Sequence, residues 1–162
     1  MKVAVIMGSK SDLPVLEKTL QTLENFGVTA VPRIMSAHRT PNQAHEFAAG
    51  AEKDGIEVII AAAGKAAHLA GVLAAYTVLP VIGLPIKSST MDGLDSLLST
   101  VQMPAGIPVA TVAINSGENA ALLAVQILAV KYPELNQKLK TYKKQMEEKV
   151  MQANSELMEE LN

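Results

Sequence analysis

Short apolar runs of strand length alternate with helix-like segments along most of the chain, and this alternation constrains the fold more than any other feature. Five runs have the length and composition of strands: residues 2–7, 28–35, 57–61, 80–83 and 108–114. Five segments have the apolar spacing or composition of helices: residues 12–26, 41–53, 66–76, 94–101 and 118–130. This alternation is typical of a parallel sheet covered by helices on both faces. We therefore expect an α/β fold, a flavodoxin-like, doubly wound five-stranded parallel sheet in a three-layer α/β/α sandwich.

Glycine and proline mark where several of these segments begin and end. Gly27 and Gly55 follow two helical segments and are expected to end them. Thr40 and Pro41 suit the N-cap and the first helical position, and Gln43 completes the spacing of a capping box. The second helix is therefore expected to begin directly after the sequence SAHRT.

The composition indicates one globular domain and excludes several classes of protein. The chain has 162 residues, 49% hydrophobic and 19% charged, with a formal net charge of -2 and no cysteine. This charge offers no electrostatic basis for binding nucleic acid, and disulfides and thiolate metal sites are excluded. Glycine, lysine, histidine and proline interrupt the apolar region from Val58 to Pro85, so it is not a membrane span. Residues 1–9 have too short an apolar stretch to be expected as a signal peptide, and a cytoplasmic protein is expected.

Residues 133–162 differ from the rest of the chain. They carry apolar side chains three or four apart between many Lys and Glu residues, which predicts one amphipathic helix, roughly 40 Å long. The chain then divides into an α/β domain at residues 1–132 and this C-terminal helix. Two placements of the helix stay open: it packs on its own domain, or its apolar stripe packs on a neighbouring subunit.

The ligand-binding edge of the predicted sheet follows from its topology. In open α/β sheets, ligands bind beyond the carboxyl ends of the strands, where the strand order reverses. The loops after the first three strands are therefore the candidates for a site, and they read GSKSD, SAHRTP and AAGKAAH.

The first loop, GSKSD, has the composition of an anion-binding turn. Gly8 allows a tight turn toward a helix, and the hydroxyls of Ser9 and Ser11 with the helix N–H groups suit a phosphate. Asp12 suits ribose hydroxyls, and the alternative is that Ser11 or Asp12 only caps the helix. The chain lacks G-x-G-x-x-G, G-x-x-x-x-G-K-[ST] and the acidic cluster of a receiver domain. These absences argue against dehydrogenases, NTPases, kinases and response regulators.

The second loop, SAHRTP, places two large polar side chains directly before a helix. Arg39 can clamp a phosphate bidentately, and Ser36 lies in the same loop. His38 is the best candidate for a general acid or base, because imidazole ordinarily titrates near neutral pH. The alternative is that both side chains belong to a solvated turn.

The third loop, AAGKAAH, is built from small residues that leave room for a flat ligand against the backbone. Gly64 follows three alanines, and His68 lies in a segment expected to be helical, where a purely structural histidine is the alternative. His45 is expected on the surface of the second helix. Three histidines scattered in this way have no metal-ligand spacing, and no metal is expected.

Six stretches in this order resemble the PurE family of N5-carboxyaminoimidazole ribonucleotide mutases: GSKSD, SAHRTP, AAGKAAHLAG, LPVIGLP, GLDSLLSTVQMPAGIPVATVAI and NAALLAVQIL. The resemblance covers residues 2–130. It implies that a carbamate loses CO2 in a closed site, and that C4 of aminoimidazole ribonucleotide then attacks the trapped CO2. It also implies that this isomerisation in purine biosynthesis uses no cofactor.

The resemblance further implies roles for individual residues. His38 would donate a proton during decarboxylation and later remove the C4 proton. Four residues match the positions that bind the 5′-phosphate and ribose: Ser9, Ser11, Asp12 and Arg39. The expected substrate-binding set is completed by the second and third loops: Ser36, Gly64, Lys65, Ala66, Ala67 and His68.

The resemblance also implies partners and leaves two alternatives. Octamers with sites at subunit junctions are implied, with the ribonucleotide and CO2 as ligands and a transient contact with the ATP-dependent carbamate-forming enzyme. Lys65 departs from the many members with a second glycine there, and residues 114–119 are shorter than in many bacterial members. A sister class carboxylates aminoimidazole ribonucleotide directly and usually carries lysine where this chain has Arg39. A non-catalytic flavodoxin-like module, in which His38 is dispensable, is the alternative from another class.

Overall fold

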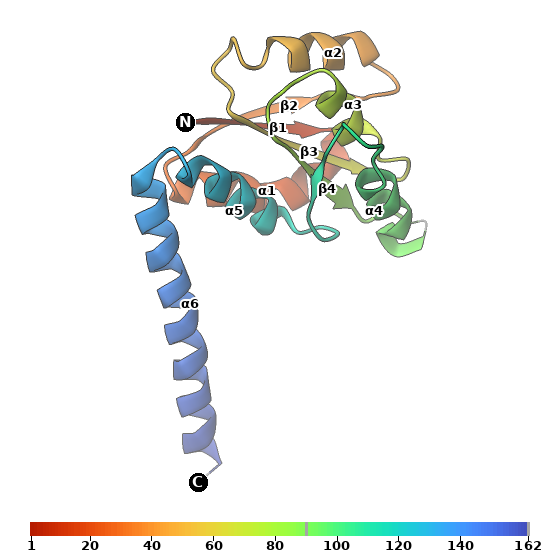
Figure 1. Ribbon diagram of the computed structural model, residues 1–162. Helices are drawn as coiled ribbons and strands as arrows, with labels where there is room; N and C mark the ends of the chain where they lie inside the picture. Colours follow the sequence, from red (N-terminus) through yellow and green to blue (C-terminus); the bar gives the residue numbers. More distant parts are fainter. Residues whose placement is uncertain (90, 162) are drawn as a thin grey trace.

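Five parallel strands form one sheet in the computed structural model, which describes residues 1–89 and 91–161 (Figure 1). The strands are β1 (Lys2–Met7), β2 (Thr29–Ile34), β3 (Val58–Gly64), β4 (Val81–Ile86) and β5 (Ala110–Thr111). Their order is β2-β1-β3-β4-β5, and each neighbouring pair is parallel. This is the strand order of flavodoxin-like doubly wound sheets, so the predicted fold class is confirmed.

Helices cover both faces of the sheet (Figure 1). They are α1 (Leu13–Asn25), α2 (Pro41–Gly50), α3 (Leu69–Ala75), α4 (Leu94–Val101), α5 (Gly117–Ala129) and α6 (Pro133–Glu160), with the 3₁₀ turns η1 (Lys10–Asp12) and η2 (Met91–Gly93). α1 and α5 pack on one face, and α2 and α3 pack on the other. The sheet and these helices form the expected three-layer sandwich.

The central strands are apolar on both sides because each side packs against helices. Val3 and Val5 belong to the core beneath α1 and α5, whereas Ala4 and Ile6 belong to the core beneath α2 and α3. All four side chains are fully buried. Side chains alternate between the two faces along a strand, so one continuous apolar run supplies both cores.

Close contact between α1 and α5 depends on a residue without a side chain. A Cβ added to Gly117 would overlap the carbonyl oxygen of Val15 and lie 2.8 Å from the Thr19 hydroxyl. That hydroxyl donates a hydrogen bond of 2.9 Å to the Gly117 carbonyl, which satisfies a buried polar group. Ala120 and Ala124 continue the small-residue face of α5 and are fully buried.

β5 is shorter at both ends than the strand expected at residues 108–114, and a proline in the neighbouring strand accounts for its early end. Only Ala110 and Thr111 pair with β4. Pro85 of β4 faces this edge, since its carbonyl oxygen accepts a hydrogen bond from the Asn115 N–H at 2.9 Å. Proline has no N–H to donate in return, so regular pairing ends early.

The predicted capping box at the start of α2 is wrong. α2 begins at Pro41 with Thr40 at the N-cap, as expected, but the Thr40 side chain does not cap the helix. Its hydroxyl accepts a hydrogen bond from the Ser36 N–H at 2.9 Å and donates to the Ser36 carbonyl at 3.1 Å. The hydroxyl therefore closes the preceding loop, and Gln43 has no partner there. α2 also ends earlier than expected, at Gly50.

The C-terminal helix α6 packs on the domain only near its start (Figure 1). Leu135 is fully buried in the core beneath α1 and α5, and Tyr142 meets the Phe26 ring edge-on at 5.8 Å. Further along, α6 extends away from the domain, and Val150 is 71% exposed. Packing on a neighbouring subunit stays a prediction, and Asn162 lies outside the described residues. In the described part of the chain, no helix is long and apolar enough to cross a membrane.

Gly117→Ala should destabilise the protein, because the added methyl group would force α1 and α5 apart. We expect the free energy of unfolding to fall by about 1–3 kcal/mol, measured by urea denaturation. Gly50→Ala is the matched control, since no described atom lies within 4 Å of the Cβ it would gain. That change should be neutral or stabilise the helix by up to about 1 kcal/mol. Equal effects of the two substitutions would contradict the close α1–α5 contact.

Candidate active site

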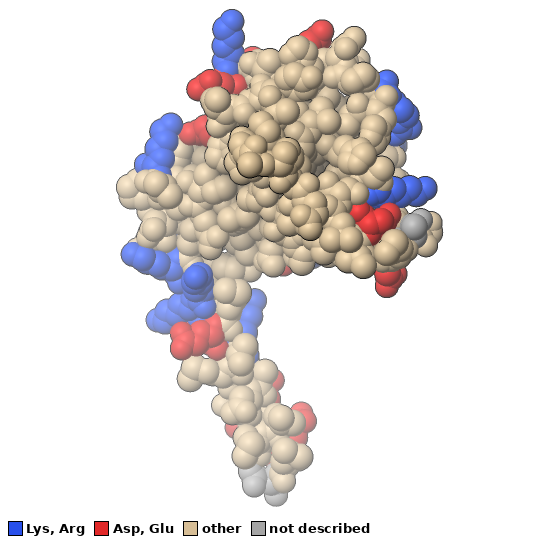
Figure 2. Space-filling model, turned by 45° about the vertical axis from the view of Figure 1, so that its right-hand side comes forward, with Lys and Arg blue, Asp and Glu red and all other residues tan. Residues whose placement is uncertain are grey.

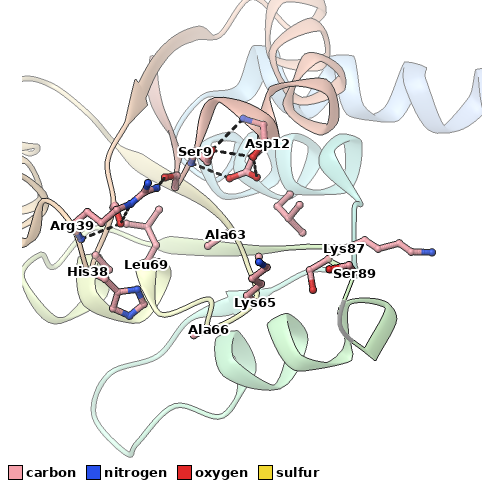
Figure 3. Close-up of a pocket in the computed structure, with 17 residues that line it drawn as sticks. Ser9, Asp12, His38, Arg39, Ala63, Lys65, Ala66, Leu69, Lys87 and Ser89 are labelled. Atoms are coloured by element: carbon pink, nitrogen blue, oxygen red, sulfur yellow. Dashed lines mark hydrogen bonds between the residues drawn. The ribbon is translucent and has the colours of Figure 1, made fainter.

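A cavity of about 640 Å³ lies beyond the carboxyl ends of β1, β2, β3 and β4 (Figure 3). Among the described residues, four loops and one residue of α3 line it: Gly8, Ser9, Ser11 and Asp12; Ser36, Ala37, His38 and Arg39; Ala63, Gly64, Lys65 and Ala66; Ile86, Lys87, Ser88 and Ser89; and Leu69. The strand order reverses between β1 and β3. The cavity therefore lies where doubly wound sheets bind their ligands.

The loop after β1 is held by a capping box of its own. Ser9 is the N-cap of η1, and its hydroxyl oxygen accepts a hydrogen bond from the Ser11 N–H at 3.3 Å. The Asp12 carboxylate accepts in turn from the Ser9 N–H at 3.1 Å. Asp12 occupies the N-cap position of α1, as one alternative allowed, but its side chain makes no capping bond to that helix and closes the box with Ser9 instead.

Asp12 is a nearly buried carboxyl group at the wall of this cavity. Only 8% of the residue is exposed, and burial raises its pKa above the ordinary range. Hydrogen bonds from the Ser9 N–H and the Ser11 hydroxyl offset part of this effect, because they favour the charged form. A partly desolvated carboxylate of this kind is suited to accept hydrogen bonds from ligand hydroxyl groups.

A tight turn after β2 holds two polar side chains in place. The Thr40 N–H donates to the Ser36 carbonyl at 2.9 Å, and the Arg39 N–H donates to the Ser36 hydroxyl at 3.2 Å. The Arg39 side chain also reaches the first loop, where its Nη2 donates to the Gly8 carbonyl at 3.2 Å. These bonds connect the two loops and place the guanidinium beside the serine hydroxyls (Figure 3).

His38 meets a second histidine from the third loop. Its Nε2 lies 2.9 Å from Nδ1 of His68, and the two rings meet edge-on with their centroids 5.0 Å apart. His68 is at the N-cap of α3, so the expectation of a histidine inside that helix is wrong. The contact restricts rotation of both rings and therefore orients His38 at the cavity.

All but two of the residues expected in the site line this cavity. The exceptions are Ala67, which is buried beneath the loop, and His68, which touches the site through His38. His45 is exposed on α2, where its ring lies 4.2 Å from that of Tyr76. Loops far apart in the sequence thus meet at one edge of the sheet.

The loop after β4 also lines the cavity, although the sequence predicts only the loops after β1, β2 and β3. Residues 87–89 line the cavity, and the Lys87 N–H donates to the Asn115 side chain at 2.8 Å. The Lys87 ammonium pairs with the Asp92 carboxylate at 2.7 Å. The signal is present in the sequence, since the polar residues KSST follow a parallel strand that ends at the same edge. Thr90 of this loop lies outside the described residues.

The groups around the cavity suit an anionic ligand and the movement of a proton. His38 and His68 can exchange a proton, while Arg39 and Lys65 supply positive charge. Within the described residues, no cluster of three or more His, Asp or Glu side chains could hold a metal ion.

Fold and site together define a class: a flavodoxin-like α/β enzyme with a histidine and an arginine at the switch point of its sheet. A family model described as AIR carboxylase matches residues 2–149. The chain belongs to this family, and the resemblance inferred from its motifs is confirmed.

Named relatives and solved structures agree with this family. The chain is 60% identical over 157 residues to the N5-carboxyaminoimidazole ribonucleotide mutase of Pyrococcus horikoshii, which covers 97% of this chain and 89% of the relative. It is 56% identical over 151 residues to the protein of the same name from Thermotoga maritima, covering 93% and 88%. It matches the crystal structure of Treponema denticola PurE with a TM-score of 0.86 at 30% identity, covering 96% and 98%.

Asp12→Asn should stabilise the fold at neutral pH. Because folding raises the pKa of this carboxyl above its ordinary 3.8, ionisation disfavours the folded state. That effect is absent in acid, develops as the pH rises above 3.8 and is complete above the raised pKa. The melting temperature of the variant should therefore exceed that of the wild type at about pH 7, and the difference should shrink toward about pH 3.

The control for this measurement is Asp54→Asn, which changes an exposed carboxylate outside the cavity. Its melting temperature should follow that of the wild type across the same range. A constant difference between Asp12→Asn and the wild type at every pH would rule out ionisation of Asp12 as the cause.

Proposed function

We propose that this chain converts N5-carboxyaminoimidazole ribonucleotide to 4-carboxy-5-aminoimidazole ribonucleotide, the mutase reaction of de novo purine biosynthesis. The observation that carries the proposal is His38, held by His68 at the wall of a cavity that also presents Arg39. Relatives named for this reaction match the chain over nearly its whole length. The enzyme is accordingly an isomerase.

The substrate is a ribonucleotide with an anionic group at each end. Arg39 and the serine hydroxyls of the first two loops form a donor-rich end that suits the 5′-phosphate. Asp12 is placed to accept hydrogen bonds from the ribose hydroxyls. Gly64 and Ala66 present little side chain to the cavity, so the flat imidazole can lie against their backbone.

His38 acts as the proton shuttle between the two halves of the reaction. The bond between the carbamate nitrogen and its carboxyl carbon breaks, and His38 gives a proton to that nitrogen. C4 of the imidazole then forms a bond to the trapped CO2, and the proton on C4 passes to His38. The histidine ends in the state in which it began. Substrate and product contain the same atoms, so the reaction consumes no oxidant, reductant or ATP.

The trapped CO2 has to be kept from escaping into water, which a single chain does not achieve. His38, Arg39 and Lys65 are all exposed in the single chain. α4, which follows the fourth loop, presents an apolar face on which Leu94 and Leu98 are 43% and 44% exposed. The face of the domain turned forward in Figure 2 carries few charged side chains across its centre. These surfaces support an octamer in which neighbouring subunits cover the site, with the free part of α6 as a further contact.

The instability of the carbamate supports direct contact between this enzyme and the enzyme that forms the carbamate. A carbamate readily loses CO2 in water, so a transient contact with the ATP-dependent enzyme that forms it would shorten its time in solution. We place both enzymes in the cytoplasm, where nucleotide precursors are made.

Direct carboxylation of aminoimidazole ribonucleotide is the second candidate function. Lys65 is the observation that favours it, because a cation in the third loop could attract bicarbonate. Arg39 in the histidine motif and the identities of 60% and 56% to relatives named as mutases favour the carbamate instead.

Supplying each carboxyl donor separately distinguishes the two functions. One reaction receives the carbamate without bicarbonate, and the other receives aminoimidazole ribonucleotide with excess bicarbonate. We expect efficient formation of the C4 carboxylate only in the first reaction. The absorbance of the product measures its formation. Efficient turnover in the second reaction alone would overturn the mutase assignment.

His38→Asn should lower kcat by about 10²- to 10⁴-fold, because the amide cannot shuttle a proton. KM and the oligomeric state should be nearly unchanged, since the substitution leaves the phosphate-binding end intact. His45→Asn is the matched control: it changes an exposed histidine of α2 and should retain full activity. A near-normal rate for His38→Asn would overturn the proposed role of His38 as the proton shuttle, and absence of turnover in the wild type would favour the non-catalytic module.

A further inference from the structure

Lys65 stands in a backbone conformation that glycine usually occupies. Its φ is 57°, in the left-handed region, where the Cβ of any other residue crowds the following carbonyl group. Gly64 before it and Ala66 after it are both small, and the three residues line the same cavity. A lysine at such a position destabilises the fold, and strain of this kind clusters at functional sites.

Three cations line the cavity among the described residues, and two of them already have partners. Arg39 donates to the Gly8 carbonyl at 3.2 Å, and Lys87 pairs with the Asp92 carboxylate at 2.7 Å. Within residues 1–89 and 91–161, the Lys65 ammonium makes no hydrogen bond or ion pair. Figure 3 shows Lys65 on the cavity wall, well apart from Arg39, so its charge is available to a ligand.

Lys65 and Arg39 come from different loops of the cavity, and they lie apart in Figure 3. Arg39 is bonded to Gly8 of the serine-rich loop, which suits the phosphate. Lys65 lies three residues before His68, on the loop whose histidine holds His38. The migrating carboxyl group has to lie near His38, because this histidine handles the proton of the carbon that receives it. Lys65 therefore belongs to the loop that holds His38, and it is apart from the bond between Arg39 and Gly8.

We propose that Lys65 is a specificity-determining residue that binds the carboxylate of the substrate and product, an inference that rests on the proposed function. A charge-assisted hydrogen bond from its ammonium stabilises the bound carboxylated nucleotides. The same lysine contributes nothing to bound aminoimidazole ribonucleotide, which has no carboxylate. It thus distinguishes two nucleotides that share the same ribose phosphate.

Calorimetric binding of two nucleotides to Lys65→Met tests this assignment. The Kd of 4-carboxy-5-aminoimidazole ribonucleotide should rise about ten- to a hundredfold, the effect of losing a hydrogen bond to a charged group. The Kd of aminoimidazole ribonucleotide should change by less than about twofold. Lys53→Met is the matched control: it removes the same charge from an exposed residue after α2 and outside the cavity, and both affinities should be kept.

The other outcomes separate the inference from the function on which it rests. Equal losses for both nucleotides would assign Lys65 to the phosphate and overturn the inference. Unchanged affinity for both nucleotides would show that the Lys65 ammonium contacts neither of them, which would also overturn the inference. If the wild type binds neither nucleotide, the proposed function itself fails, and this assignment fails with it.

Lys65→Gly supplies an independent readout of the strain. Glycine adopts a φ of 57° without the Cβ contact, so relief of strain should outweigh the greater freedom of glycine in the unfolded chain. The melting temperature should rise by about 1–3 °C, while affinity for the carboxylated nucleotide falls as in Lys65→Met. A lower melting temperature would contradict the strain from which the inference starts.

Discussion

The parallel pairing of β1 with both β2 and β3 is the constraint on which the whole site depends. At its end, β1 sets Met7 level with Ile34 on one side and with Ala62 on the other. Three loops therefore leave the sheet at the same height. The chain crosses from β1 to β2 in one direction and reaches β3 in the other, so helices leave on opposite faces and a cavity stays open between the loops. The bonds from Arg39 to Gly8 and from His38 to His68 follow from this convergence.

Small residues make this convergence possible. A Cβ on Gly64 would lie 3.2 Å from the Ile86 carbonyl oxygen, and one on Gly83 would lie 2.9 Å from the Val109 side chain. Only 3% of the residues are aromatic, so aliphatic and small side chains fill the cores. Small side chains also line part of the cavity wall, where the third loop exposes mostly backbone. A planar ligand can therefore lie close to the main chain, and the few long side chains decide which charges it meets.

The parts of the structure that depend on local pattern could be predicted, and the parts that depend on distant partners could not. Alternating apolar runs predict the sheet and its ligand edge, and hence the position of His38. The bond from His38 to His68 joins residues 30 positions apart. The early end of β5 depends on Pro85 in another strand, which no pattern within residues 108–114 reveals. α2 has no capping box because the single hydroxyl of Thr40 accepts a hydrogen bond from the Ser36 N–H instead of from the helix.

The histidine pair connects the position of a proton with the orientation of a ring. A hydrogen bond between two ring nitrogens needs one proton between them, so the 2.9 Å contact of His38 Nε2 with His68 Nδ1 requires that one nitrogen donates and the other accepts. When both facing nitrogens carry protons, the two N–H groups repel and the bond is lost. A proton that reaches His38 Nε2 while His68 is a donor therefore frees the ring to donate to an acceptor in the cavity. In the mutase reaction proposed above, that acceptor would be the carbamate nitrogen, so His38 would become free to move in the same step in which it acts as an acid.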